Sequence, residues 1–183
     1  MDERFRQLIE LGAGEFEHAN SLLIAHLEGT RCLLKAWKAS DVVQDAGLYL
    51  AAYGTSNFEK KIFELSHRKE VADVIGNDAE NIIYHYCACD KTLFFAQFGQ
   101  VNLPVFYNRI TNKMSTVSSE LLQQLCELYA ANKTERAIND PGFLTQHGSE
   151  LVDLFSRMQL FLSFRAQRKI QHVFASQSRA DPH

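Results

Sequence analysis

The sequence contains few residues that interrupt helices, with three prolines and nine glycines among 183 residues. Proline and glycine are the strongest breakers of regular structure, so their scarcity favours long helices over a fold of short strands and turns. A chain of this length can form one domain that buries about 70% of the surface exposed by its unfolded state. We therefore expect a single all-α domain over residues 1–176, followed by a flexible tail at 177–183.

Apolar residues recur at helical spacing through most of the chain, and the interruptions divide it into separate helices. Between residues 104 and 117 the pattern changes, because two short apolar runs flank the polar segment Thr111-Asn112-Lys113. This arrangement predicts a minor β-hairpin at 104–117. The helices are expected at roughly residues 2–11, 21–37, 41–53, 59–76 (in one or two pieces), 78–90, 119–138, 148–162 and 164–175.

Composition and charge exclude several classes of function. The formal net charge is −3, and the 19 basic residues are scattered, so we expect no nucleic-acid partner. No signal peptide or apolar run of 18 residues is present, so we expect no membrane association and a cytoplasmic location. The four cysteines fall within apolar helical patterns and suggest no disulfide framework. Motifs of P-loops, dinucleotide-binding folds, serine hydrolases and zinc proteases do not occur in the sequence.

The stretch from His18 to Phe58 concentrates the residues that could carry chemistry. His26 is embedded in the apolar stripe of a predicted helix, and Tyr53, Thr55 and Asn57 follow where the next helix should end in a loop. Loops held by a rigid scaffold often carry binding residues. The same segment can also be explained as a helix end, with Gly54 in the left-handed conformation after the last turn.

The motifs of this stretch resemble a known superfamily. Residues 18–30 read H-A-N-x-x-L-x-x-H-L-x-G-T, and residues 46–55 read A-G-L-x-x-x-x-Y-G-T. Together with Cys89-Asp90 and Leu128–Asn132, they resemble a bacterial group within the HD-domain-like superfamily. The resemblance implies a helical bundle in which a histidine, a His-Asp pair and a later aspartate bind one or two metal ions. It would make His26 the first of these histidines.

The sequence departs from the superfamily at the positions of the metal ligands. By resemblance, the His-Asp pair would fall at Leu50 and Ala51, and neither leucine nor alanine can coordinate a metal. No histidine in the sequence is followed by an aspartate. We therefore expect a degenerate site with no metal and no cofactor.

Other residues are candidates for a pocket within the bundle. His85 and Asp90 lie on or next to the central helix, and Asn132 lies on the long helix where the superfamily's last carboxylate would fall. Glu135 lies there too but is expected to face solvent. For His26, two interpretations remain open: a core histidine bonded to a neighbouring helix, or an acid/base that lines a pocket.

These observations predict an all-α, HD-domain-like bundle that binds a small polar molecule and is a metal-independent or accessory enzyme. His26 is the predicted catalytic residue. The alternatives are a metal-dependent phosphohydrolase or oxygenase with an unusual ligand set, and a non-catalytic homodimer formed through the phenylalanines near 94–98 or 155–164. The predicted substrate-binding residues are His18, Tyr53, Thr55, Asn57, His85, Asp90 and Asn132.

Overall fold

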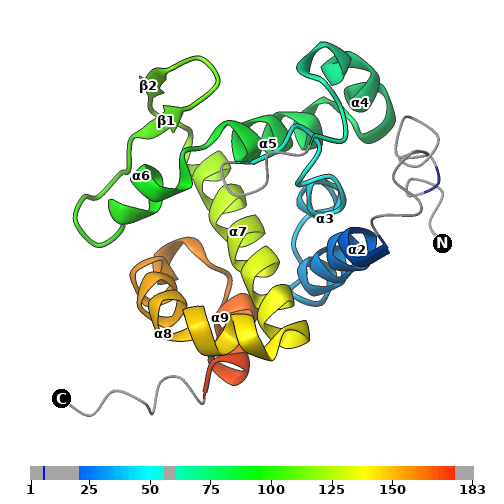
Figure 1. Ribbon diagram of the computed structural model, residues 1–183. Coiled ribbons are helices and arrows are strands. Elements are labelled where there is room, and N and C mark those ends of the chain that lie inside the picture. The colour runs from blue at the N-terminus through cyan, green and yellow to red at the C-terminus, as the bar shows by residue number, and fades with distance from the viewer. Residues whose placement is uncertain (1–5, 7–20, 56–60, 176–183) are drawn as a thin grey trace.

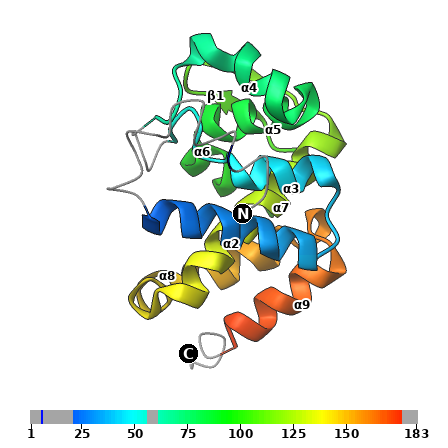
Figure 2. The same cartoon turned by 90° about the vertical axis from the view of Figure 1, so that its right-hand side faces the viewer.

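A long helix, α7 (Ser119–Asn139), runs through the middle of the fold (Figure 1). In the computed structural model, which describes residues 6, 21–55 and 61–175, three helices pack along one part of α7 and two along another. The first three are α2 (Ser21–Ala36), α3 (Asp41–Leu48) and α5 (Asn77–Ala88). The other two are α8 (Pro141–Arg157) and α9 (Phe164–Val173), which Figure 2 shows below α2 and α3. The predicted all-α class is confirmed.

α7 occupies the centre because its buried residues lie on several faces of the helix. Leu122, Leu128, Ala130 and Ala131 are each at most 1% exposed. A helix that is apolar on most of its faces must be covered on most of its faces. The two alanines add no bulk, so neighbouring helices can approach the α7 backbone closely. Full burial of each large apolar side chain contributes about 2 kcal/mol.

Four helices begin at an aspartate or serine whose side chain accepts a hydrogen bond from a backbone N–H three residues later. Such a cap satisfies a group with no partner within the helix and contributes about 1 kcal/mol. The caps and donors are Asp90 and Leu93 for α6 (Lys91–Ala96), Ser118 and Leu121 for α7, Asp140 and Phe143 for α8, and Ser163 and Ala166 for α9. The last-but-one helix was expected to begin near residue 148, but α8 begins at Pro141. Proline fits the first turn of a helix, because the backbone N–H that it lacks would have no partner within the helix there.

The segment after α3 differs from the prediction that this helix continues to Tyr53. α3 ends at Leu48, and residues 49–53 continue in turns. The backbone N–H groups of Ile62 and Phe63 both donate to the carbonyl of Ala52, at 3.0 and 2.8 Å, and draw it away from a helical path. Gly54 has φ 71°, the left-handed conformation proposed for it, but it does not directly follow a helix, because α3 ends at Leu48.

The predicted hairpin is present as two short antiparallel strands, β1 (Phe106–Asn108) and β2 (Lys113–Ser115). Phe106 pairs with Ser115, and Asn112 in the connecting turn has φ 53°, which asparagine tolerates. Phe106 is 1% exposed and anchors the hairpin to the core. The remaining elements are α4 (Arg68–Ile75) and the 3-10 helices η2 (Leu65–His67) and η3 (Gln159–Phe161).

The phenylalanines of α6 are part of the core. Phe94, Phe95 and Phe98 are buried, and the rings of Phe94 and Phe106 meet edge to face with centroids 5.9 Å apart. These side chains are therefore not available for the dimer surface expected near residues 94–98. In the second region, Phe155 is also buried and Phe164 is 72% exposed. A homodimer through that region stays a prediction.

No helix in the described part of the chain combines the length and the apolar character that crossing a bilayer requires. The predicted tail at 177–183 and, apart from residue 6, the predicted helix at 2–11 lie outside the described residues.

Candidate functional site

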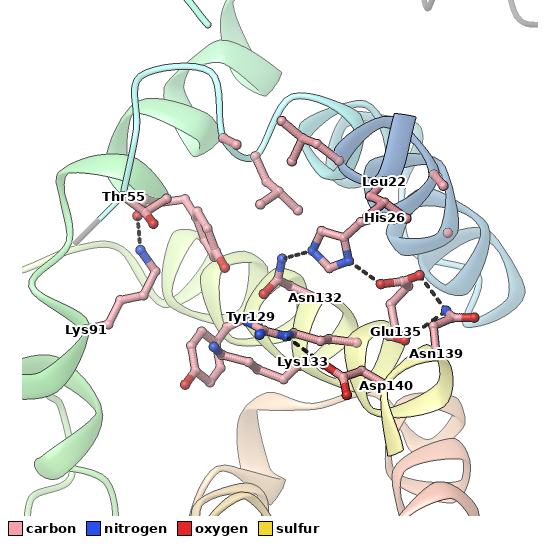
Figure 3. A pocket seen from close by; sticks show the side chains of 17 residues that line it. Leu22, His26, Thr55, Lys91, Tyr129, Asn132, Lys133, Glu135, Asn139 and Asp140 are labelled. Atoms are coloured by element: carbon pink, nitrogen blue, oxygen red, sulfur yellow. Dashed lines mark hydrogen bonds and ion pairs between the residues drawn. The ribbon is translucent and has the colours of Figure 1, made fainter. Parts of the chain in front are cut away.

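A cavity of about 970 Å³ opens between α2, α7 and the turns that follow α3 (Figure 3). Its wall is mixed: apolar side chains come from α2 and the turns, and polar and charged ones come mainly from α7. The volume is within the range of small-molecule sites. The lining residues are Leu22, Leu23, Ala25, His26, Gly29, Leu50, Ala51, Thr55, Tyr86, Lys91, Tyr129, Asn132, Lys133, Glu135, Arg136, Asn139 and Asp140.

His26 is held between two side chains of α7 (Figure 3). Its Nδ1 is hydrogen-bonded to Oε2 of Glu135, and its Nε2 lies 2.9 Å from Nδ2 of Asn132. Because the carboxylate accepts, Nδ1 carries the proton in the neutral imidazole and Nε2 accepts from the Asn132 amide. Nδ2 of Asn139 donates to the other oxygen of Glu135 at 2.6 Å. The imidazole is thus bound at both nitrogens.

Helix geometry brings these residues together. Asn132, Glu135 and Asn139 are three and four residues apart on α7, so they share the face that meets α2. On α2, Gly29 is one turn beyond His26 and faces the same carboxylate. The side chain of His26 is 24% exposed and that of Glu135 is 8% exposed, so the pair is only partly accessible from the cavity.

Apolar residues occupy part of the wall near His26. Leu50 and Ala51 line the cavity and are 4% and 3% exposed. These are the two positions where the resemblance to HD-domain-like proteins would put a metal-binding pair. Within residues 21–55 and 61–175, no three His, Cys, Asp or Glu side chains gather closely enough to hold a metal ion.

Two lysines line the cavity away from the His26–Glu135 pair. Nζ of Lys91 donates to the backbone carbonyl of Tyr86 at 2.9 Å and lies 4.3 Å from the centroid of that tyrosine's ring. Lys91 is 8% exposed, and burial lowers the pKa of its ammonium group to about 8. Burial and the nearby Arg136 also lower the pKa of Lys133, whose Nζ lies 5.4 Å from the ring centroid of Tyr129.

Of the predicted site residues, His26, Thr55 and Asn132 line the cavity. His18 and Asn57 lie outside the described residues. His85 is not among the lining side chains: its Nδ1 bonds to the backbone carbonyl of Asn81 at 2.8 Å. The carboxylate of Asp90 caps α6.

Tyr53 lies in a separate polar cluster under α4. Its hydroxyl donates to Oε1 of Glu80 at 2.9 Å, and burial, followed by the negative charge of Glu80, raises its pKa. The guanidinium of Arg68 donates two hydrogen bonds to the same carboxylate, from Nε at 2.6 Å and from Nη2 at 2.7 Å. The cluster joins the turns after α3 to α4 and α5. The structure therefore gives Tyr53 a structural partner and no contact with the cavity.

Five residues of the site were not predicted from the sequence: Gly29, Lys91, Lys133, Glu135 and Asn139. Glu135 is 6% exposed and does not face solvent as expected, because the face of α7 that carries it is covered by α2. Its spacing of three residues from Asn132 was the available signal. Gly29 and Lys91 gave no comparable signal, because their roles depend on what packs against them.

Comparison with known proteins adds one match. Residues 7–91 match the model of a family described as a domain of unknown function (DUF6817). The matched segment includes His26, Thr55 and Lys91 and stops before α7, which supplies Asn132 and Glu135. No match was found among curated proteins or among solved structures.

Proposed function

We propose that this protein is a metal-independent enzyme that binds a small polar molecule in the cavity and uses His26 for acid/base catalysis. The observation that carries the proposal is the placement of His26, with Nδ1 on Glu135 and Nε2 toward Asn132 at the cavity wall. A carboxylate at Nδ1 holds the ring in one tautomer and stabilises the imidazolium that forms when Nε2 accepts a proton.

The mechanism assigns each residue a role. A substrate O–H or N–H group takes the place of the Asn132 amide at Nε2 of His26, and the imidazole removes its proton. Glu135 balances the resulting positive charge, and Asn139 keeps the carboxylate aligned through its 2.6 Å hydrogen bond. Asn132, released from Nε2, can then bond to the substrate. This sequence of steps needs no metal ion.

The position of the cavity also supports the proposal that the scaffold is a degenerate HD-domain-like bundle. His26, Leu50 and Ala51, three positions that the resemblance assigns to a metal site, all line one cavity with Glu135 of α7. Positions that are distant in the sequence would converge in this way if an ancestral metal site had lost its ligands. The apolar replacements at 50 and 51 then leave His26 free for proton transfer.

The test uses a metabolite mixture in a buffer that contains a metal chelator. Wild-type protein should consume at least one component of the mixture, as measured by proton NMR. The His26→Gln variant should consume that component about 100-fold more slowly, or slower still. His172→Gln is the matched control, because His172 is exposed on α9 and outside the cavity lining. Equal rates for wild type and His26→Gln would contradict the proposal. Near-stoichiometric Fe, Mn or Zn in protein purified without chelator would contradict its metal independence.

A further inference from the structure

The charges that line the cavity are unevenly distributed. The two carboxylates of the lining are already engaged: Glu135 binds His26, and Asp140 caps α8 and lies 3.9 Å from Nε of Arg136. Among the described residues, no carboxylate forms an ion pair with Lys91 or Lys133. In Figure 3, Lys91 lies on the opposite side of the cavity from Glu135. Within residues 21–55 and 61–175, therefore, no carboxylate compensates the positive charge at this end of the cavity.

The neighbours of Lys91 do not neutralise it. The thiols of Cys87 and Cys89 are close, but burial raises their pKa values to about 11 and about 12, so both are uncharged near neutral pH. Arg109 and Lys133 also act on Lys91, and both are cations that lower its pKa. The guanidinium of Arg109 donates to the backbone carbonyls of Cys87 and Gly54, at 2.9 and 3.2 Å, and brings no negative charge.

The described residues also leave part of the hydrogen-bonding capacity of Lys91 unfilled. An ammonium group has three donors, and the carbonyl of Tyr86 is the acceptor that the structure gives it. The face of the Tyr86 ring offers weak additional attraction. A buried cation without a counter-ion destabilises a fold unless something else compensates it. An anionic group in the cavity would supply both the charge and the missing acceptors.

We propose that the cavity binds an organic anion whose carboxylate or phosphate group contacts Lys91 and Lys133 and whose reacting group lies at His26. The part of the ligand between these ends is apolar, because Leu23, Leu50 and Ala51 contribute to the wall. The anionic end follows from the charges alone. The placement of the reacting group rests on the function proposed above.

The test compares small aromatic probes that differ in charge. Phenyl phosphate or benzoate should bind the full-length protein in titration calorimetry and raise its melting temperature, whereas uncharged benzyl alcohol should not. Which of the two anions binds more tightly identifies the acidic group. Lys91→Met should weaken this binding by 10-fold or more, whereas Lys113→Met, an exposed lysine on β2, should leave it unchanged. Equal binding by wild type and Lys91→Met, or no binding of either anion to wild type, would overturn the proposal.

A second measurement does not depend on how the variant folds. Since an anion stabilises the ammonium form, its binding to wild type should raise the pKa of Lys91 from about 8. Calorimetry at pH 8 in buffers of different ionisation enthalpy should therefore show proton uptake on binding, and none would contradict a contact with Lys91. The variant His26→Gln should lose turnover but still bind the anion, so measuring both on it separates the two proposals. Anion binding without any turnover would retain this inference and reject the enzyme, and turnover of neutral compounds only would do the reverse.

Discussion

Gly29 of α2 and Glu135 of α7 are so close that no side chain fits between them. A Cβ atom at position 29 would lie 2.7 Å from Oε1 and 2.8 Å from Cγ of Glu135. Glycine at this position therefore allows the carboxylate to reach His26, one turn earlier on the same helix. The absence of a side chain is part of the site.

Replacing Gly29 with alanine should separate His26 from Glu135 while the fold is retained. The clash falls on a side chain that can move, and alanine favours a helix over glycine by about 1 kcal/mol, so the net change in stability should stay within about 1 kcal/mol. The low-field proton NMR signal of the His26 Nδ1–H should disappear. His26→Gln assigns the signal, and an unchanged signal in Gly29→Ala would contradict the steric argument.

The hydrogen bond between His26 and Glu135 should contribute measurably to stability. Glu135→Gln keeps the size of the side chain and removes its charge, and it should cost about 1.5–3 kcal/mol in the free energy of unfolding. Combined with His26→Gln in a double-mutant cycle, it should show a coupling energy of about 1 kcal/mol. The exposed pair Lys61–Glu64 is the control and should show little coupling. Additive effects of the two substitutions at the site would reject the pairing.

Local rules predicted the parts of the fold whose determinants are close in sequence. The helix predicted at 119–138 is present as α7, which Ser118 caps, and a turn at 109–112 connects the two strands of the predicted hairpin. The end of α3 was predicted wrongly, because residues 49–53 are compatible with a helix and the hydrogen bonds from Ile62 and Phe63 decide otherwise. These hydrogen bonds join segments that are separate in the sequence, so they leave no periodic pattern of residues.

The candidate site was predictable only in part for the same reason. His26 and Asn132 stand out by residue type and position. Glutamate is a residue type that usually faces solvent, and Glu135 is buried only because its face of α7 meets α2. A sequence pattern shows that a helix has faces, but the partner of each face depends on the packing of the whole bundle.

Tyr53 and Arg68 should affect stability and not ligand binding. Tyr53→Phe removes one hydrogen bond to Glu80 and should cost about 1 kcal/mol in urea unfolding. Arg68→Met should cost more, about 2 kcal/mol after allowance for the 37% exposure of Arg68, because it leaves a buried carboxylate without its cation. If Tyr53→Phe instead weakens the binding of phenyl phosphate or benzoate without loss of stability, Tyr53 is a binding residue.

The burial of Lys91 should appear in the pH dependence of stability. Its pKa is about 8 in the folded protein against an ordinary value of 10.5. Between these values the unfolded state binds more protons than the folded state, so the contribution of Lys91 to stability rises with pH by up to about 3 kcal/mol. Below about pH 8 the ammonium is charged in both states, and its destabilising effect is complete.

Denaturant unfolding of wild type and Lys91→Met between pH 7 and 10.5 checks this expectation. The variant should be the more stable protein at pH 7, and wild type should recover most of the difference by pH 10.5. In the unfolded state the thiols of Cys87 and Cys89 ionise in this range, but both proteins contain them, so they contribute similarly to both stabilities. A difference that does not change with pH would contradict the lowered pKa of Lys91.

The two sides of the cavity should differ in how much their residues vary among related proteins. Asn132 and Glu135 belong to α7, which packs against five other helices, so a backbone shift there would disturb most of the core. Leu50, Ala51 and Thr55 lie after the end of α3, outside any helix, so a backbone change there need not displace a helix. Related proteins that process different molecules should therefore vary at positions 50, 51 and 55 and retain the residues of α7. Amide hydrogen exchange should follow the same division, with the α7 amides exchanging only through global unfolding.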